Sequence, residues 1–460
     1  MTDTNPNENL FPCRVMPEDP GQARLVGIYP QVQEGRFMQR VRIPGGRLDG
    51  PGWRTLAKLA RRYTPATPLH LTTRQDIELH DLSAADIPPL QQALCAVGLS
   101  TLGACGDTPR NITICPCSGL APGSVELLPL AKAIAARLAG IEGVYRLPRK
   151  FKIALACGPH CGQPFLNDLA LTAVRRDGRW GFRAVLAGSL GPVPATGVVY
   201  REWLDPDQAV ALAVAAVNVF AAEGDRANRR KARLRHVRQR VGEEAFGALI
   251  DQSFASVLAS EKSQSPAIDM VPPSQPLAAS RILFFPNGDV SADVADALGL
   301  LSDRPDLAVR LANQHQAVLF ASSDSVLATV LREQRSLQTA ADAGAGPSVV
   351  ACPGKRWCAR AVTATAPLAD RLRADLSGVL PPGAVVCISG CPNGCAHTLV
   401  ADAGLAGRVS EGREVFDLYL GGGMGRDTRL ARSAFAKLSD DKVVQAIRRY
   451  FTASPAAPAE

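Results

Sequence analysis

The chain lacks any apolar run long enough to cross a bilayer. Its most apolar stretch, Ala209–Ala222, is interrupted by Asn218 and is shorter than the roughly 20 residues that a membrane-spanning helix needs. The first ten residues, MTDTNPNENL, are polar and show no charged-then-apolar signal pattern. We therefore expect a cytoplasmic protein that does not associate with membranes.

Signatures of nucleic-acid and dinucleotide binding are also missing. The sequence has no zinc finger, no RNA-recognition signature and no interleaving of aromatic with basic residues. GGGMG at Gly421–Gly425 has no strand–GxGxxG–helix context, so it predicts a turn rather than a flavin or nicotinamide site. The net charge of +8 is best read as a solvated surface. The basic run Arg226–Arg240 predicts a helix whose charges are mostly solvated, with a minority near an anionic cofactor or an acidic protein.

The 460 residues are too many for one typical core and predict two or three domains. Short β-branched runs such as LHLTT and FKIAL alternate with Ala/Leu-rich helical runs such as LLPLAKAIAARLA. This pattern predicts a mixed α/β or α+β fold. Residues 260–280 are rich in Ser and Pro without periodicity, which predicts a linker.

The two halves carry similar landmarks in the same order. PGGRL at residues 44–48 and PNGDV at residues 286–290 each precede a helical stretch and then a strand, and these strands place Arg74 opposite Gln314. A Cys-x3-Cys pair in each half is followed, after six residues, by Asp-x-x-Leu. Matched landmarks predict a duplicated architecture.

Cysteine carries the strongest signal. Twelve cysteines in a large cytosolic chain are more often metal ligands or buried thiols than a disulfide framework. Cys352-x5-Cys358 followed by Cys391-x3-Cys395 suits a [4Fe–4S] cluster, which takes one cysteine per iron. On a helical turn the sulfurs of the last two project to one side, and nearby Pro and Gly residues let backbone amides approach. Structural zinc and inert buried thiols are the alternatives, but zinc usually pairs ligands two to four residues apart. Cys387 is predicted to be core.

The first half has a weaker set of cysteines. Its x3 pair, Cys157 and Cys161, matches the second half, whereas Cys115-x-Cys117 is not an x5 pair. This favours a degenerate copy over a second cluster. Cys13, Cys95 and Cys105 receive no role.

Cationic residues gather in three motifs of the first half. Arg74 lies in TTRQ, Arg110 lies in GDTPRN, and Lys150 and Lys152 lie in LPRKFKIAL, where period-two alternation puts both lysines on one strand face. Lysines crowded on one face repel unless an anion or acid lies between them. Taken singly, each cation is best read as solvated. Beside an electron-transfer cluster, together they predict a site that binds and protonates a small oxyanion.

The sequence resembles the siroheme-dependent sulfite/nitrite reductase family over most of its length. The resemblance runs from GIYPQVQEGRFMQRVRIPGGRL through LTTRQDIELH, GACGDTPRN and LPRKFKIA to ACPGKRWC and SGCPNGCAHTLVADAGL. It implies an α+β (α/β mixed) fold of duplicated ferredoxin-like halves around a central siroheme/[4Fe–4S] site. The implied domains are a ferredoxin-like half-domain (1–85), a siroheme/substrate-binding α/β domain (86–259), a linker (260–280), a second ferredoxin-like half-domain (281–345) and a cluster/siroheme-binding domain (346–460).

The resemblance also implies roles for individual residues. A siroheme would share the thiolate of Cys395 with a cluster completed by Cys352, Cys358 and Cys391. The distal face, where substrate meets the iron, would be lined by Arg74, Arg110, Lys150 and Lys152, with Arg110 and Asn111 also at the siroheme.

The implied reaction is the six-electron reduction of sulfite to sulfide or of nitrite to ammonia. Lys152, the second lysine of its motif, favours sulfite. Electrons would come from a ferredoxin or a flavoprotein. Ala403 and the PGKRW loop depart from the commonest family pattern. Two alternatives remain: precorrin-3B synthase, a related branch that holds a tetrapyrrole as substrate, and a non-catalytic iron–sulfur electron-transfer subunit.

Overall fold

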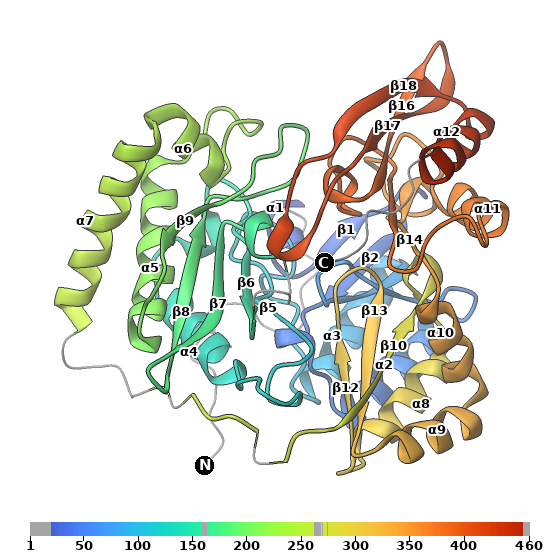
Figure 1. The fold of residues 1–460 in the computed structure, drawn as a ribbon, viewed down its shortest axis with the longest axis horizontal. Coiled ribbons are helices and arrows are strands. Elements are labelled where there is room, and N and C mark those ends of the chain that lie inside the picture. Colours follow the sequence, from blue (N-terminus) through green and yellow to red (C-terminus); the bar gives the residue numbers. More distant parts are fainter. Residues whose placement is uncertain (1–19, 159–162, 262–267, 269, 274, 454–460) are drawn as a thin grey trace.

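Figure 1 shows the computed structural model, which describes residues 20–158, 163–261, 268, 270–273 and 275–453. The strands of these residues form three five-stranded sheets and one three-stranded sheet. Helices and strands are interspersed along the chain, so the predicted α+β class is confirmed. Within the same residues, no helix is both long enough and apolar enough to span a bilayer.

The first sheet has the strand order β1-β2-β4-β3-β11. Its helix α2 begins after Asp49, whose carboxylate accepts a hydrogen bond from the Gly52 amide at 2.8 Å, an N-cap that satisfies one open donor. Trp53, Leu56 and Ala60 form its buried face at helical spacing. The elements are α1 (Pro20–Leu25), β1 (Ile28–Pro30), β2 (Phe37–Val41), α2 (Gly50–Tyr63), β3 (Leu69–Leu71), β4 (Ile77–Leu82) and α3 (Ile87–Cys95).

The second half repeats this arrangement with a three-stranded sheet, β10-β13-β12. Its strand β11 leaves that sheet and pairs antiparallel with β3, joining Asp289 to His70 and Val290 to Leu69. One apolar core spans both halves. The elements are β10 (Ala279–Phe284), β11 (Asp289–Val290), α8 (Ala292–Ser302), β12 (Leu307–Leu311), β13 (Gln316–Ala321), α9 (Asp324–Glu333) and α10 (Arg335–Ala345).

Two further sheets have the same topology, β5-β6-β7-β8-β9 and β14-β15-β16-β17-β18. In each, the first two pairings are parallel and the last two antiparallel, so the predicted duplication is confirmed. The strands are β5 (Thr113–Ile114), β6 (Ile153–Ala156), β7 (Leu169–Arg176), β8 (Arg179–Leu186), β9 (Val198–Arg201), β14 (Ser348–Ala351), β15 (Val385–Ser389), β16 (Ala403–Ser410), β17 (Arg413–Leu420) and β18 (Arg432–Leu438).

Helices cover these two sheets from outside (Figure 1). Helix α5 is apolar on every side and buried, as expected of a helix packed between a sheet and other helices. The predicted linker begins where α7 ends, and its described residues before β10 form no helix or strand. The domain boundaries themselves stay a prediction. The helices are α4 (Leu128–Ala139), α5 (Pro206–Glu223), α6 (Leu234–Val241), α7 (Glu243–Glu261), α11 (Ala366–Asp375) and α12 (Asp440–Ala453).

Two local predictions are corrected. The basic run Arg226–Arg240 is helical only from Leu234, because Arg233 has extended backbone angles and its side chain turns inward. Lys150 and Lys152 precede β6 rather than lying within it, although Phe151 between them forms an isolated bridge with Pro109.

Candidate cofactor and anion site

The four cysteines of the second half lie in tight turns that follow two parallel strands. Cys352 follows β14, and Cys391 follows β15 by one residue. Cys391 and Cys395 lie in turns rather than in a helical turn. Gly354 and Gly394 have φ of 56° and 64°, a left-handed conformation that disfavours side chains. A Cβ atom on Gly354 would lie 2.3 Å from Thr365 Oγ1, so that turn requires glycine.

The same four thiols converge. The pKa of Cys352 is raised to about 12, first by burial and then by the neighbouring Cys395 and Cys391. Burial also raises the pKa of Cys358, and Cys395 adds to the rise. The pKa of Cys391 rises by burial, with Cys395 and Cys358 adding. Cys352, Cys358 and Cys391 therefore each lie close enough to Cys395 for their charges to interact.

Backbone amides point at these sulfur atoms. The Gly390 amide donates to Cys352 Sγ at 3.2 Å, and amides of Ala361 and Asn393 lower the pKa of Cys358 and Cys391. Such donors stabilise thiolates and a negatively charged cluster. Among the residues that the structure describes, no group of three or more His, Cys, Asp or Glu side chains is arranged to hold a metal ion. A cubane spreads its ligands over four irons, so these residues fit a [4Fe–4S] cluster.

Strands of the first half support the cysteine turns. The Val32 amide donates to Trp357 O at 3.2 Å, and the Trp357 ring stacks on His80 with centroids 5.2 Å apart. Thr73 Oγ1 donates to Cys395 O at 3.0 Å. The TTRQ segment and Cys395 are therefore in direct contact.

Arg74 is half-buried at the amino ends of β5 and β6. Its guanidinium donates to Asn167 Oδ1 at 2.8 Å and to the carbonyls of Asn111 and Ile153 at 3.1 and 3.3 Å. Loss of hydration lowers the pKa of Arg74 to about 10, which leaves it charged at neutral pH.

Arg110 and Asn111 have polar atoms without partners. Arg110 donates to Ala104 O at 2.6 Å, and Asn111 Nδ2 donates to Ile43 O at 2.8 Å. Among the described residues, however, buried Arg110 Nε and Asn111 Oδ1 have no hydrogen-bond partner. Orphaned buried polar atoms are rare unless a ligand or water meets them, so this wall fits a polar cofactor or an anion.

Lys150 and Lys152 bring two amino groups close to Cys395 and to several other cations. Neither ammonium has a hydrogen bond or ion pair with any residue that the structure describes. Desolvation lowers the pKa of Lys150 to about 7, with Arg233 and Arg110 lowering it and Cys395 opposing the fall. The pKa of Lys152 is well below its ordinary value, first from desolvation and then from Arg74. An anion would relieve this repulsion.

Sequence reasoning missed the residue that anchors this region. Arg233 forms a two-point ion pair with Asp168, at 2.7 Å to Oδ2 and 3.3 Å to Oδ1, and both side chains are buried. Asp168 Oδ2 also accepts from the Lys152 amide at 2.8 Å. The signal was present: Asp168 is a landmark of the repeat, and Arg233 lies in the basic run.

Other cysteine predictions have mixed outcomes. Cys387 is fully buried in β15, which confirms it as core. Cys95, which had no role, is disulfide-bonded, and Cys105 is buried. Cys13 and Cys161 lie outside the described residues.

Comparison with protein families matches most of the chain to nitrite and sulfite reductases. Residues 105–257 and 347–453 match the family described as "Nitrite and sulphite reductase 4Fe-4S domain". Residues 29–97 match "Nitrite/Sulfite reductase ferredoxin-like half domain".

Similar proteins align over nearly the whole chain. The ferredoxin–nitrite reductase of Synechococcus elongatus is 29% identical, covering 94% of this chain and 90% of that protein. The sulfite reductase [NADPH] hemoprotein beta-component of Acidithiobacillus ferrooxidans is 30% identical, covering 84% and 76%. The structure of Mycobacterium tuberculosis NirA protein superposes with a TM-score of 0.77 at 25% identity, covering 93% of this chain and 86% of that one.

Proposed function

Because the chain belongs to the nitrite and sulphite reductase family, we propose that it prefers sulfite as its substrate and holds it with Lys150 and Lys152. Membership makes the chain an oxidoreductase of sulfite or nitrite, with a [4Fe–4S] cluster and a siroheme as cofactors. The choice between the two anions, the role of each residue and the donor belong to the proposal.

Cys352, Cys358, Cys391 and Cys395 would hold the cluster, and Cys395 would be shared with the siroheme iron. The loaded cofactors supply electrons and an iron that binds the substrate. Arg110 and Asn111 would turn their unpartnered atoms to the siroheme or its ligand. Thr73 fixes the Cys395 turn through its hydrogen bond.

The lysines would act on the anion itself. Their ammonium groups attract its oxygens, and each carries protons at Nζ that can pass to oxygen as it leaves. A lysine whose pKa is about 7, as for Lys150, gives up a proton at neutral pH far more readily than an ordinary lysine. Arg74 already donates to Asn167 and two carbonyls, so we assign it mainly to positioning and long-range charge.

Two lysine side chains whose Nζ atoms have no hydrogen-bond or ion-pair partner among the described residues are the observation that carries the sulfite preference. A bound anion favours the protonated form of both. Each charge pair near 4 Å is worth about 4 kcal/mol at an effective dielectric constant of about 20. Sulfite as a dianion gains roughly twice as much from each lysine as nitrite does. One lysine is enough to neutralise a monoanion, and the attraction added by the second lysine is largest for a dianion.

An acidic ferredoxin is the proposed electron donor. The similar protein of Synechococcus elongatus is named a ferredoxin–nitrite reductase, and the net charge of +8 favours an acidic partner. A flavoprotein is the alternative donor. A cytoplasmic location stays a prediction.

The two other functions have no support. None of the relatives reported above is named a precorrin-3B synthase. That reaction also gives no role to Lys150 and Lys152, whose amino groups have no partner among the described residues. A non-catalytic electron-transfer subunit would need no anion pocket.

The test is turnover of sulfite and nitrite by anaerobically purified enzyme with reduced viologen as donor. Lys152→Gln should lower kcat/KM for sulfite at least about tenfold more than for nitrite, because each tenfold step is about 1.4 kcal/mol. Lys58→Gln, which removes an equal charge from an exposed site on α2, should change neither. Equal losses for both anions, or faster native turnover of nitrite, would refute the sulfite preference.

A further inference from the structure

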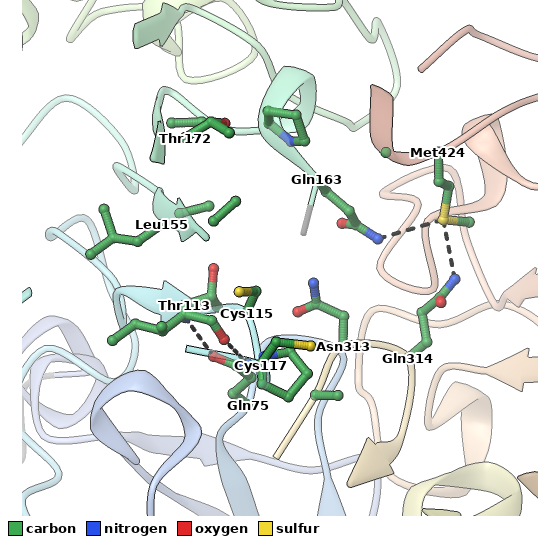
Figure 2. A pocket seen from close by; sticks show the side chains of 18 of the residues that line it. Gln75, Thr113, Cys115, Cys117, Leu155, Gln163, Thr172, Asn313, Gln314 and Met424 are labelled. Atoms are coloured by element: carbon green, nitrogen blue, oxygen red, sulfur yellow. Dashed lines mark hydrogen bonds between the residues drawn. The ribbon is translucent and has the colours of Figure 1, made fainter. Parts of the chain in front are cut away.

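A cavity of about 400 Å³ lies between the carboxyl ends of β5 and β6 and the second half of the chain. Figure 2 shows Cys115 and Cys117 on one wall and Met424 across from them. Gln314 and Gln163 donate to Met424 Sδ at 3.2 and 3.5 Å. Since Gln314 is the repeat partner of Arg74, this cavity is the counterpart of the proposed cofactor site.

The strand pairings fix which cysteines are equivalent. Cys115 follows β5 as Cys352 follows β14. Their amides donate to Leu155 O at 3.0 Å and Ile388 O at 2.9 Å. These carbonyls occupy equivalent registers on β6 and β15. Cys115 is therefore the first-copy counterpart of a cluster cysteine.

The prediction that Cys157 matches Cys391 is wrong by one residue. Strand β6 pairs with β7 in the register in which β15 pairs with β16, so the residue after β6, Cys157, corresponds to Gly390. The amides agree: Cys157 N donates to Cys115 Sγ, and Gly390 N donates to Cys352 Sγ, both at 3.2 Å. Sequence spacing misled because the second copy has one more residue in this stretch.

This one-residue difference changes what the copy can bind. A Cβ atom on Gly390 would lie 3.0 Å from Thr363 O and 3.1 Å from Ala361 Cβ, so the cluster copy leaves no room for a side chain there. In the first copy the side chain of Cys157 occupies that place. Its Sγ lies 2.9 Å from Cys115 Sγ, closer than non-bonded heavy atoms normally approach, which for carbon is about 3.5–4.0 Å.

We propose that Cys115 and Cys157 are a dithiol that a low-molecular-weight disulfide oxidises reversibly to an intramolecular disulfide. Cys157 is partly exposed, whereas Cys115 is 4% exposed. The Cys157 thiolate therefore attacks the small disulfide and releases one thiol. The Cys115 thiolate then attacks the mixed disulfide at Cys157 and releases the second. Two S–H protons are lost, one S–S bond forms, and two electrons reduce the small disulfide to two thiols.

The new bond ties the end of β5 to the end of β6. It closes the segment between residues 115 and 157, which includes α4, and restricts the unfolded chain. Oxidation therefore raises the melting temperature of the enzyme. The site is separate from the cluster, whose four cysteines lie in the other copy.

The test treats anaerobic holoenzyme with oxidised glutathione, alkylates the remaining thiols and maps peptides by mass spectrometry. The expected result is a cross-linked peptide pair containing Cys115 and Cys157, reversed by dithiothreitol, with a raised Tm. Cys115→Ser and Cys157→Ser should each abolish the cross-link and the Tm rise. Cys387→Ser, a buried thiol on the equivalent β15, should retain both.

Three results would overturn the proposal. In the first, Cys115 and Cys157 remain alkylatable after treatment, or each forms only a mixed disulfide with glutathione. In the second, either one pairs with Cys117 or Cys161 instead. In the third, iron per chain falls in Cys115→Ser while the cluster spectrum persists, because that loss would reveal a second metal site rather than a dithiol.

Discussion

Replacing Asp168 by Asn should destabilise the first α/β sheet strongly. Asp168 is fully buried and Arg233 nearly so. Removing one partner of a buried ion pair leaves the other charge uncompensated, which costs about 3–5 kcal/mol. Asn at this position keeps an oxygen for the Lys152 amide, so the loss comes from the charge and not from the backbone contact.

The repeat supplies a matched control. Asp402 occupies the equivalent position and accepts from the Val385 amide at 2.9 Å, but no ion pair joins it to any described residue. Asn at position 402 also keeps an oxygen for this amide, so Asp402→Asn should cost no more than about 0.5–1.5 kcal/mol, the range of one hydrogen bond. The difference between the two variants isolates the Arg233 interaction at roughly 2–4 kcal/mol.

Thermal unfolding of cofactor-loaded enzyme measures the effect. At about 2–4 °C per kcal/mol for a domain of this size, Asp168→Asn should melt at least about 6 °C below the native enzyme. Asp168→Asn/Arg233→Met should recover part of the loss, because the uncompensated charge is gone. Equal shifts for Asp168→Asn and Asp402→Asn would refute the reasoning, since the ion pair would then contribute nothing.

Two further predictions concern pH and the joint between the halves. Burial lowers the pKa of His70 to about 4. Between about pH 6.5 and pH 4 the His70 imidazole is therefore protonated in the unfolded chain but neutral in the folded chain. Stability should therefore fall by about 2 kcal/mol between pH 7 and pH 5 from this residue. His70→Gln should flatten the Tm profile over that range, and an unchanged slope would contradict it. Gly46 and Gly35 both have φ of 69°, but a Cβ on Gly46 would lie 2.6 Å from Leu311 O and one on Gly35 would meet nothing within 4 Å. Gly35→Ala should cost about 1–2 kcal/mol for its backbone angle. Gly46→Ala should lower Tm clearly further, because its methyl group also meets Leu311 O. Equal Tm values for the two variants would show that this contact is relieved without cost.

Local sequence patterns predicted the fold class and the turns that carry the cysteines, because these depend on short-range chemistry. Proline and glycine beside cysteine predict turns whatever the rest of the chain does, and the alternation of strands with helices predicts an α+β fold. The predicted duplication followed from landmarks such as Asp168 and Asp402, whose carboxylates hold equivalent strands.

Long-range pairing could not be read from the same patterns. Nothing local shows that Arg233 leaves the basic run to meet Asp168, 65 residues away. The misplaced match of Cys157 has the same origin, because equal spacing to Asp168 hides an offset that only strand register reveals. The hydrogen-bond partners of Arg74 come from three separate segments, so its contacts could not be predicted from the sequence either.

The exchange of β11 into the first sheet has a consequence for how the chain can be divided. Without β11, strand β3 would be an open sheet edge, which invites pairing with other chains. Because Asp289 and Val290 cover that edge, the first ferredoxin-like half is protected from self-association only when the second half is attached.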